Sequence, residues 1–419
     1  MIKVGSPTLA RIEDMTILSV SVDNGYDGTL SDLTFTFESS YENGLAIDRA
    51  DGLLVCMLHW LAAHNYDVTF DLPISERLYY QITEFIIPAL KRATKVYCPS
   101  MASPLPRGKY VGTGMTCGVD SLTTFKLNVT KDIPAENKVN ILTFFDAGTF
   151  AGHNAKADIT LDRNGNLIGD ASIRASETFQ NSKKFADEVG LPLFYIRSNL
   201  GQVLKYKEFQ PQEFSFTLNG CILLFQKMFR IYYFSSTRSL DDFGVDREQL
   251  LDTSRYDVFT MPMISTDILT FYSAGSPYSR LEKTSLIAAD KLAQKYLSVC
   301  TGSAHNCGYC DKCTRTILSL EALGSLDCFS EVFDLERYSH TRTKQIGKVI
   351  ARKFTRDVYL TPIYSMLKKQ HKIPWLSYIW ALIFLAMNPF TRMFKNMDIE
   401  TKNKLRRWGV KHNLINPFH

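Results

Sequence analysis

The feature that most constrains the fold is a regular alternation of strand-like and helix-like segments that begins at Lys109. Short apolar runs rich in β-branched and aromatic residues alternate with longer segments of helical periodicity. This order predicts a parallel sheet covered by helices on both faces, which is a doubly wound α/β fold. Ligands of such sheets bind at the carboxyl ends of the strands, so the functional residues are expected in the turns that follow the strands. The expected strands are 109–115, 138–148, 191–199 and 230–237, and the expected helices are 120–129, 176–190 and 216–229.

The first hundred residues follow a different pattern. Strands are expected over 15–22, 33–39 and 66–73, and helices over 51–65 and 74–93. The proline-containing stretch 100–109 has the composition of a boundary. We therefore expect a small N-terminal α+β domain over 1–105, followed by an α/β domain over 106–335.

The charge of the chain is unevenly distributed. Residues 341–419 hold 16 Lys and Arg against 3 acidic residues, whereas residues 1–340 hold 32 against 40. The segment 336–419 is therefore expected to be a helical basic tail. Its charge favours an anionic partner, either a membrane surface, an acidic protein or nucleic acid, or an acidic surface of the same chain.

Composition places the chain among ordinary globular proteins, with 45% apolar and 22% charged residues. The N-terminal residues lack the basic and apolar regions of a secretory signal. A cytoplasmic location is therefore expected. Because the tail is basic, peripheral attachment to the inner face of the membrane is a second expectation. In a reducing compartment, closely spaced cysteines more often bind metal than form disulfides.

Four of the nine cysteines form such a cluster. Cys300, Cys307, Cys310 and Cys313 have the spacing C-x6-C-x2-C-x2-C, and an x2 spacing places two thiolates on one tight turn. Four sulfur ligands favour a closed structural Zn²⁺ site, although an iron–sulfur cluster uses the same ligands. Four unligated thiols are the remaining alternative. His305 lies inside the segment and is expected at the surface.

The turn after the first α/β strand, Gly114–Ser121, is rich in small residues. Backbone N–H groups at such a turn, where a helix begins, suit phosphate. The turn has neither the Gly-Lys-Ser/Thr of a Walker A loop nor the glycine spacing of a Rossmann fingerprint. The simpler alternative is a turn in which Asp120 caps the helix.

Two of these motifs carry a family resemblance. Thr116-Cys117-Gly118-Val119-Asp120-Ser121 resembles the Ser-Gly-Gly-x-Asp-Ser loop of the N-type (PP-loop) ATP pyrophosphatases. The loop at the start of the domain and the cysteine segment at its end together resemble the layout of the 7-cyano-7-deazaguanine synthase branch. The resemblance covers about residues 109 to 325 and leaves both ends of the chain outside it.

The resemblance implies an α/β fold of the HUP type, similar to adenine nucleotide α-hydrolases, that uses ATP and Mg²⁺. It implies that Thr116, Gly118 and Ser121 contact phosphate and that Asp120 is the carboxylate on the Mg²⁺ side. Cys117 stands where the family has its first glycine, so a Cβ enters a backbone that approaches phosphate closely in the family. The expected nucleotide-binding residues are Gly114, Thr116, Cys117, Gly118, Val119, Asp120 and Ser121.

Two cations farther along the chain complete the expected site. Arg280 and Lys283 stand where the family carries a lysine near the nucleotide, so the resemblance assigns them a catalytic role with Asp120 and Ser121. Their alternative is a solvated helix start. Ser235, Ser236 and Thr237 end an expected strand and are further candidates to line the pocket, or are plain turn residues.

Enzymes of this branch are ATP-dependent ligases: they activate a small-molecule carboxylate as an acyl-adenylate, which an amine or ammonia then attacks. This chain has "FTLNGC" where the family carries Pro-Gly-Arg-Asn. It therefore resembles specialised relatives, some of which act in bacterial anti-phage systems and attach a deazapurine acid to a protein amine, so a protein partner or protein substrate is expected. Alternatives are an RNA-thiolating enzyme of the same superfamily and a catalytically inactive nucleotide-binding scaffold subunit.

Within the tail, residues 374–390 are uncharged and rich in aromatic side chains, with Lys and Arg on both sides. A buried or partner-facing helix, an interfacial membrane helix and a membrane span are the alternatives for this segment. The basic segment 402–412 is either a nucleic-acid contact or a solvated face.

Overall fold

The computed structural model describes residues 1–130, 132–147, 160–161, 167–168, 170–204, 214–245, 252–300, 305–353 and 357–396. The chain folds into two compact units, Met1–Asp334 and Leu335–His419. The second unit begins one residue before the tail expected from the charge pattern. The segment 402–412 lies outside the described residues.

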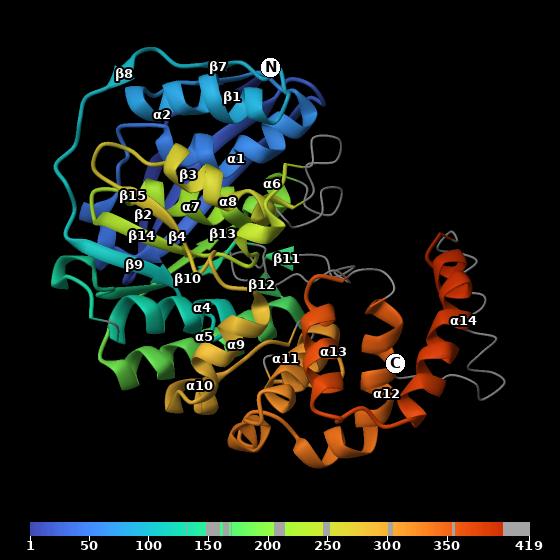
Figure 1. Ribbon diagram of the computed structural model, residues 1–419. Helices are drawn as coiled ribbons and strands as arrows, with labels where there is room; N and C mark the ends of the chain where they lie inside the picture. Colours follow the sequence, from blue (N-terminus) through green and yellow to red (C-terminus); the bar gives the residue numbers. More distant parts are fainter. Residues whose placement is uncertain are drawn as a thin grey trace. The chain divides into compact units, whose positions relative to one another are not determined.

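One large sheet organises the first unit (Figure 1). It has 11 strands, in the order β15-β14-β9-β10-β13-β4-β3-β1-β5-β7, with β2 beside β3. Two pairs of two-residue strands, β6 with β8 and β11 with β12, lie outside it. The strands of the large sheet are β1 (Ile2–Val4), β2 (Thr8–Ile12), β3 (Met15–Asn24), β4 (Thr29–Glu38), β5 (Val68–Phe70), β7 (Val96–Tyr97), β9 (Tyr110–Gly114), β10 (Ile141–Asp146), β13 (Leu193–Ser198), β14 (Phe229–Ser235) and β15 (Thr270–Ala274). The short strands are β6 (Ile74–Ser75), β8 (Met101–Ala102), β11 (Thr160–Leu161) and β12 (Leu167–Ile168).

Five strands of the large sheet, β9, β10, β13, β14 and β15, form the α/β part. The expected strands account for the first four, whereas β15 was not expected from the sequence. All five are parallel, and numbered in chain order they lie in the order 3-2-1-4-5. This is a doubly wound arrangement, in which the chain leaves β9 toward one side of the sheet and later returns to its other side at β14. The α/β class is thus confirmed, and the switch point of the topology lies between β9 and β14.

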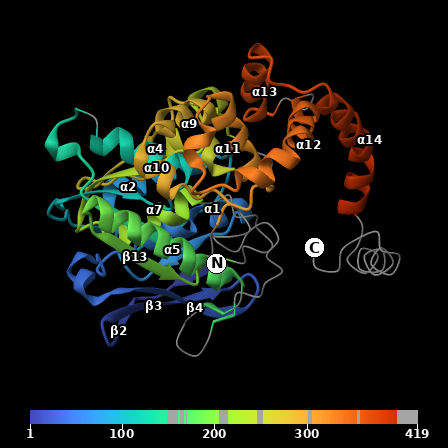
Figure 2. The same cartoon turned by 90° about the horizontal axis from the view of Figure 1, so that it is seen from below.

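Helices cover both faces of this part of the sheet. Figure 1 shows α4, α5, α9 and α10 on one face, and α1, α7 and α8 on the other. The view from below groups α4, α9 and α10 with α11 (Figure 2). The helices are α1 (Asp51–His64), α2 (Glu76–Gln81), α3 (Ile87–Ala89), α4 (Val119–Phe125), α5 (Asp170–Val189), α6 (Leu200–Val203), α7 (Phe214–Leu224), α8 (Asp257–Met263), α9 (Arg280–Ala288), α10 (Lys291–Tyr296) and α11 (Asp311–Ala322).

Two of the expected helices switch from α-helix to π-helix along their length. The expected helix 120–129 is α4 followed by a π-helix, η3 (Lys126–Thr130), and the expected helix 74–93 is α2, a π-helix η2 (Ile82–Ile86), and α3. The expected helix 216–229 ends earlier, at Leu224, and β14 begins at Phe229. Short 3₁₀ helices make the remaining turns: η1 (Ser39–Gly44), η4 (Ala135–Asn137), η5 (Leu240–Asp242), η6 (Thr253–Arg255) and η7 (Leu326–Phe329).

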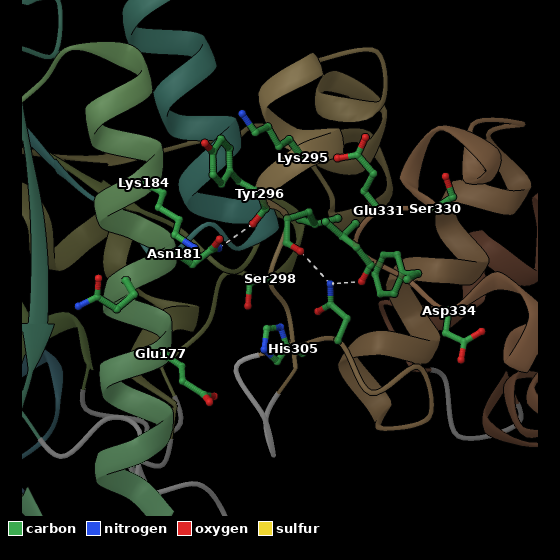
Figure 3. Close-up of a pocket in the computed structure, with 15 residues that line it drawn as sticks. Glu177, Asn181, Lys184, Lys295, Tyr296, Ser298, His305, Ser330, Glu331 and Asp334 are labelled. Carbon is green, nitrogen blue, oxygen red and sulfur yellow. Dashed lines mark hydrogen bonds between the residues drawn. The ribbon is translucent and has the colours of Figure 1, made fainter.

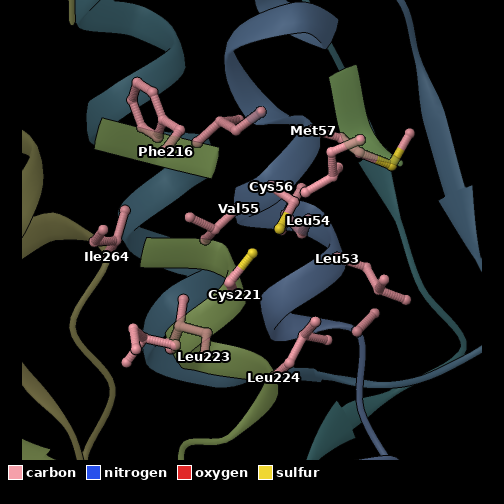
Figure 4. Packing of buried hydrophobic residues seen from close by; sticks show 14 of the residues in the cluster. Leu53, Leu54, Val55, Cys56, Met57, Phe216, Cys221, Leu223, Leu224 and Ile264 are labelled. Atoms are coloured by element: carbon pink, nitrogen blue, oxygen red, sulfur yellow. The ribbon is translucent and has the colours of Figure 1, made fainter. Parts of the chain in front are cut away.

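Residues 1–105, expected to be a domain of their own, share the sheet and the core of the α/β part. β4 pairs antiparallel with β13, with Phe37 opposite Ile196. On one face of the sheet α1 packs against α7, where Cys56 and Cys221 lie among aliphatic side chains (Figure 4). The two helices approach so closely that a Cβ at Gly220 would collide with the backbone nitrogen of Cys56. The proline-containing stretch 100–109 is therefore a connection within one unit, because backbone pairing and a common apolar core join the segments on its two sides.

The second unit is helical. It contains α12 (Leu335–Lys353), α13 (Leu360–Lys369) and α14 (Leu376–Asn396), and α12 packs against the other two. The uncharged segment 374–390 forms most of the length of α14. No helix in the described part of the chain combines the length and the apolar composition needed to cross a membrane.

Candidate functional site

The loop expected to bind phosphate joins β9 to α4. Its backbone is tied to two neighbouring segments: Met115 N donates to Thr143 O of β10 at 2.9 Å, and Ser298 N donates to Cys117 O at 2.8 Å. Ser121 Oγ donates to Gly118 O at 3.1 Å, across the first turn of the helix. The strand, loop and helix thus occur in the order predicted from the sequence, and the loop is braced from both sides.

Cys117 has an unusual backbone conformation. Its φ is 55°, in the left-handed region that favours glycine, so a residue with a Cβ is strained at this position. The side chain is fully buried and forms a hydrogen bond with Ser182 of α5. Burial raises the pKa of the thiol to about 12, so Cys117 is a neutral packing group at physiological pH. The Cys117 side chain lies beneath the loop and does not line the cavity above it.

That cavity has a volume of about 330 Å³ and lies at the carboxyl ends of β9, β10 and β14. This is the position that a doubly wound sheet offers to ligands, next to the switch point. Of the residues predicted from the loop, all but Cys117 line it: Gly114, Thr116, Gly118, Val119, Asp120 and Ser121. Of the three hydroxyl residues at the end of β14 and directly after it, Ser235 and Thr237 line the cavity and Ser236 does not.

Asp120 is held by the two cations predicted to accompany it. Arg280 Nη2 lies 2.7 Å from Asp120 Oδ2, and Lys283 Nζ lies 3.5 Å from Asp120 Oδ1. Burial of the carboxylate acts to raise its pKa, but Arg280 and Lys283 outweigh burial, so the pKa of Asp120 lies below its usual range. Asp120 is therefore ionised at physiological pH. The structure brings together three of the four predicted catalytic residues in one contact, and Ser121 follows in the same helical turn.

The two cations lie in the first turn of α9 rather than before it. Arg280 is the first residue of the helix, whose N-terminus carries a capping box between Ser279 and Glu282. Arg280 lines the cavity, whereas Lys283 is 1% exposed and lies behind Asp120. The capping box fixes the start of the helix, and with it the position of Arg280 at the cavity wall.

A second carboxylate, Asp257 at the start of α8, lies on the far side of Lys283. Ser273 Oγ donates to Asp257 Oδ1 at 2.8 Å, and Lys283 Nζ donates to Ser236 O at 2.6 Å. Asp257 Oδ2 is buried and has no hydrogen-bond partner in the described structure. Burial raises the pKa of Asp257 to about 6, and burial also lowers the pKa of Lys283, although Asp120 and Asp257 oppose that second effect.

Two further cavity residues were not identified from the sequence. Lys312 and Arg315 lie in the first half of α11, directly after the cysteine segment, and both line the cavity. With Arg280 they bring three cations to the cavity wall, and the charge of Arg315 contributes to the low pKa of Asp120. The cavity wall is thus strongly basic. In the sequence, these two basic residues lie on either side of Cys313. Their position beside a metal-ligand motif indicates no role in a cavity, so they were not predicted.

The four cysteines of the predicted cluster come together in space. Their sulfur atoms all lie within 4.8 Å of one another, and the pairs Cys307–Cys313 and Cys300–Cys310 are both separated by 3.9 Å. A tetrahedral zinc site with Zn–S bonds of about 2.3 Å has sulfur–sulfur edges of about 3.8 Å, so the arrangement fits such an ion. The cluster can therefore hold a metal ion such as zinc.

The backbone around the cluster is also suited to thiolates. Cys310 N donates to Cys307 Sγ at 3.3 Å, and Cys313 N donates to Cys310 Sγ at 3.4 Å. Gly308, with φ of 77°, makes the tight turn between Cys307 and Cys310. The sulfurs of Cys300 and Cys310 raise the pKa of Cys313 well above its usual range. Four thiols this close cannot all ionise without a compensating cation, so a bound divalent metal would take the place of their protons.

The cluster and the cavity are connected through α11. Cys300 lines the cavity, Cys310 is the N-cap of α11, and Cys313 lies in its first turn. Fixing these sulfurs therefore fixes the end of the helix that carries Lys312 and Arg315. His305, expected at the surface, is exposed and is not part of the sulfur cluster.

The remaining cysteines do not reach the cavity. Cys56 and Cys221 lie in the core between α1 and α7 (Figure 4). Cys328 is exposed. Within the described residues, Cys300 is the only cysteine that lines the cavity. In the part of the chain that the structure describes, the site thus offers no thiol outside the cluster of four cysteines.

A second hollow, of about 560 Å³, lies beside Ser298, which also borders the first cavity (Figure 3). Asn306 spans its floor, donating to Leu297 O at 2.8 Å and to Val332 O at 3.0 Å. Its charged side chains, among them Glu177, Lys184 and Glu331, are exposed. They carry both signs, so this hollow shows no preference for a charge type.

Comparison of the chain with known proteins gave no match to a family model, to a curated protein or to a solved structure.

Proposed function

We propose that the protein is an ATP-dependent ligase of the PP-loop type that activates a carboxylate. In the first step, a carboxylate oxygen of the substrate attacks the α-phosphorus of ATP, and the bond from that phosphorus to the departing pyrophosphate breaks. In the second step, an amine or ammonia attacks the carbonyl carbon of the acyl-adenylate and AMP leaves. The fold expected for this function is of the HUP type.

The observation that carries the proposal is the basic cavity at the switch point, built around the loop 116–121. A triphosphate brings several negative charges, and the cavity wall supplies Arg280, Lys312 and Arg315. Arginine and lysine are common phosphate ligands, and backbone N–H groups where a helix follows a strand add to them. The volume of about 330 Å³ lies within the usual range for small-molecule sites.

The cavity also has an apolar side that suits a purine and its ribose. Phe145, Leu218, Tyr232 and Phe234 contribute to the wall. The hydroxyl of Tyr232 is engaged with Thr143 Oγ1 at 2.6 Å, so this ring offers its apolar surface rather than its polar end. A ligand that is anionic at one end and aromatic at the other matches both parts of the wall.

The donor set fits Mg²⁺ carried on a nucleotide. Mg²⁺ is usually held by one or two carboxylates together with phosphate oxygens and water, and among the described residues Asp120 is the one carboxylate at the cavity wall. Bound Mg²⁺ would help to neutralise the charge that develops on the departing pyrophosphate. Arg280 positions Asp120, and Lys312 and Arg315 stabilise negative charge on the phosphates without transferring a proton.

The nature of the site favours this reaction over the alternatives. Sulfur transfer to RNA needs a reactive thiol, and apart from metal-cluster Cys300 no described cysteine lines the cavity. The inactive-scaffold alternative depended on Cys117 obstructing the loop, and that side chain is buried beneath it. We propose the substrate by its chemical class only. It is a small carboxylic acid, such as a deazapurine acid, and the acceptor is ammonia, a small amine or a protein amine.

The decisive experiment measures pyrophosphate release by the purified protein with ATP, Mg²⁺ and a panel of carboxylic acids, with and without an amine. We expect release that depends on one acid and is abolished by Asp120→Ala. Lys183→Ala, which removes an exposed cation paired with Asp187 outside the cavity, is the matched control and should leave release unchanged. If ATP does not bind the wild-type protein, as measured by calorimetry, the proposal is wrong.

A further inference from the structure

The second unit presents an apolar surface that the proposed function does not use. Between residues 375 and 387, large apolar side chains are exposed on one side of α14 and at the residue before it. Their exposed fractions include 71% for Trp375, 67% for Leu382 and 51% for Met387. We call this surface the outer face of α14. It consists of Trp375, Leu376, Ile379, Leu382, Ile383 and Met387.

The opposite side of α14 is already occupied by α12. Ser377 and Ala381 are buried, and a Cβ at Gly347 of α12 would collide with Cβ of Trp380. The outer-face residues recur at spacings of three and four, which places them on one stripe along the helix. A helix that is apolar on both sides normally has both sides covered, so the outer face requires a partner.

The positive charge of the second unit favours an anionic partner for the outer face. Residues 335–396 contain 12 Lys and Arg but only two acidic residues, Glu336 and Asp357. Lys368 and Lys369 are exposed at the end of α13, shortly before α14 begins. Lys344 of α12 is exposed and lies 5.3 Å from the ring centroid of Trp380. Cations thus lie on α12, which packs against α14, and at the end of α13, which packs against α12.

An apolar stripe with cations and tryptophan beside it is typical of helices that lie in the interface of an anionic membrane. Each basic residue near such a surface contributes favourable attraction, and the apolar side chains bury themselves among the lipid tails. A second copy of this chain fits less well, because a symmetric contact would bring two strongly basic surfaces together. Nucleic acid would pair with the cations but would leave the aliphatic side chains in water.

We propose that the outer face of α14 docks in the plane of an anionic lipid membrane, with the basic side chains of α12 and α13 against the lipid headgroups. The inference is independent of the reaction at the cavity. It assigns the second unit to attachment of the protein to a lipid surface.

The test is co-sedimentation of the full chain with vesicles of phosphatidylcholine alone or of an equal mixture of phosphatidylcholine and phosphatidylglycerol. We expect binding to the anionic vesicles, weakened by salt, and little binding to the neutral ones. Leu382→Glu and, separately, Trp375→Glu should each lower the vesicle affinity by about tenfold or more, because a large apolar side chain no longer enters the lipid. Both side chains are exposed, so the melting temperature should stay unchanged.

Leu240→Glu is the matched control, because Leu240 is 49% exposed but lies in the first unit. It should bind vesicles like the wild type. Equal affinity of the wild type and Leu382→Glu, or equal binding to neutral and anionic vesicles, would overturn the proposal. Dissociation of a dimer by Leu382→Glu in light scattering, or a lower melting temperature, would also overturn it, since the face would then be covered by a second copy or by the rest of the chain.

Discussion

Arg280 Nη2 lies 2.7 Å from Asp120 Oδ2, which joins the first residue of α9 to the first turn of α4 across 160 positions of sequence. Both side chains are largely buried, with exposed fractions of 9% and 18%. The pair therefore fixes the carboxylate that the loop presents to the cavity. It also sets the local balance of charge, because any ligand of Asp120 must be compatible with Arg280.

Removing the arginine should cost stability. Arg280→Gln leaves Asp120 with Lys283 as its remaining cationic contact, and we expect the free energy of unfolding to fall by about 2 kcal/mol, with a smaller loss for Arg280→Lys. Urea denaturation at neutral pH measures the change. The exposed pair Lys183–Asp187 supplies the comparison, and Lys183→Ala should change stability by less than about 0.5 kcal/mol. Equal effects of the two substitutions would contradict the buried role of Arg280.

The buried carboxylate of Asp257 should make stability depend on pH. Its pKa is about 6 in the folded protein against 3.8 ordinarily, so between these values the folded state holds a proton that the unfolded state has lost. Stability contributed by this group therefore falls as pH rises, by about 2 kcal/mol between pH 4 and pH 8. Asp257→Asn removes this group from the titration.

The measurement compares the two proteins across that range. The unfolding free energy of Asp257→Asn relative to the wild type should rise with pH and level off above about pH 7. Parallel stability curves for the two proteins would show that Asp257 does not titrate with a raised pKa. Measuring both proteins in the same buffers cancels the contributions of all other groups.

The cysteine cluster should contain metal. We expect about one zinc per chain in the purified protein by elemental analysis, and loss of that zinc in Cys313→Ser together with a lower melting temperature. Cys328→Ser is the control, because Cys328 is exposed and lies outside the cluster. Visible absorbance with stoichiometric iron would instead identify an iron–sulfur cluster.

Replacing Cys117 by glycine should be nearly neutral for stability. Glycine removes the strain of a side chain at φ of 55°, which is on the order of 1 kcal/mol, but it also removes a fully buried thiol of similar value. We therefore expect Cys117→Gly to unfold within about 1 kcal/mol of the wild type. Cys117→Val keeps the unfavourable backbone and adds a branched side chain, so it should be clearly less stable. A large loss in the glycine variant would show that the thiol packing dominates.

The two tasks assigned to α11 can be separated. Lys312→Ala and Arg315→Ala should weaken ATP binding by about tenfold each, because a charged contact to phosphate is lost, while the zinc content stays the same. Calorimetric titration and metal analysis on the same preparations measure both. Loss of zinc in these variants would indicate damage to the helix rather than a phosphate contact.

Much of the local structure could be predicted from the sequence, because it depends on short-range periodicity and spacing. The alternation after Lys109 predicts four of the five parallel strands and the turn at Gly114–Ser121, and the cysteine spacing predicts the cluster of four sulfurs. Lys312 and Arg315 were not predicted, because the residues next to them in the sequence do not indicate which cavity they line. Asp257 was missed for the same reason, since its environment is made by Ser236 after β14, by β15 and by α9.

The sequence by itself determined the α/β class, the loop that ends β9 and the set of possible metal ligands, because each is encoded within a few tens of residues. Tertiary structure decided the rest. Pairing of β4 with β13, and packing of α1 on α7, merged residues 1–105 with the α/β part, because an open sheet edge and an exposed apolar helix face are both stabilised when they are covered. The same long-range packing brought α9 and α11 to the loop, and only there did three cations and one carboxylate become a site.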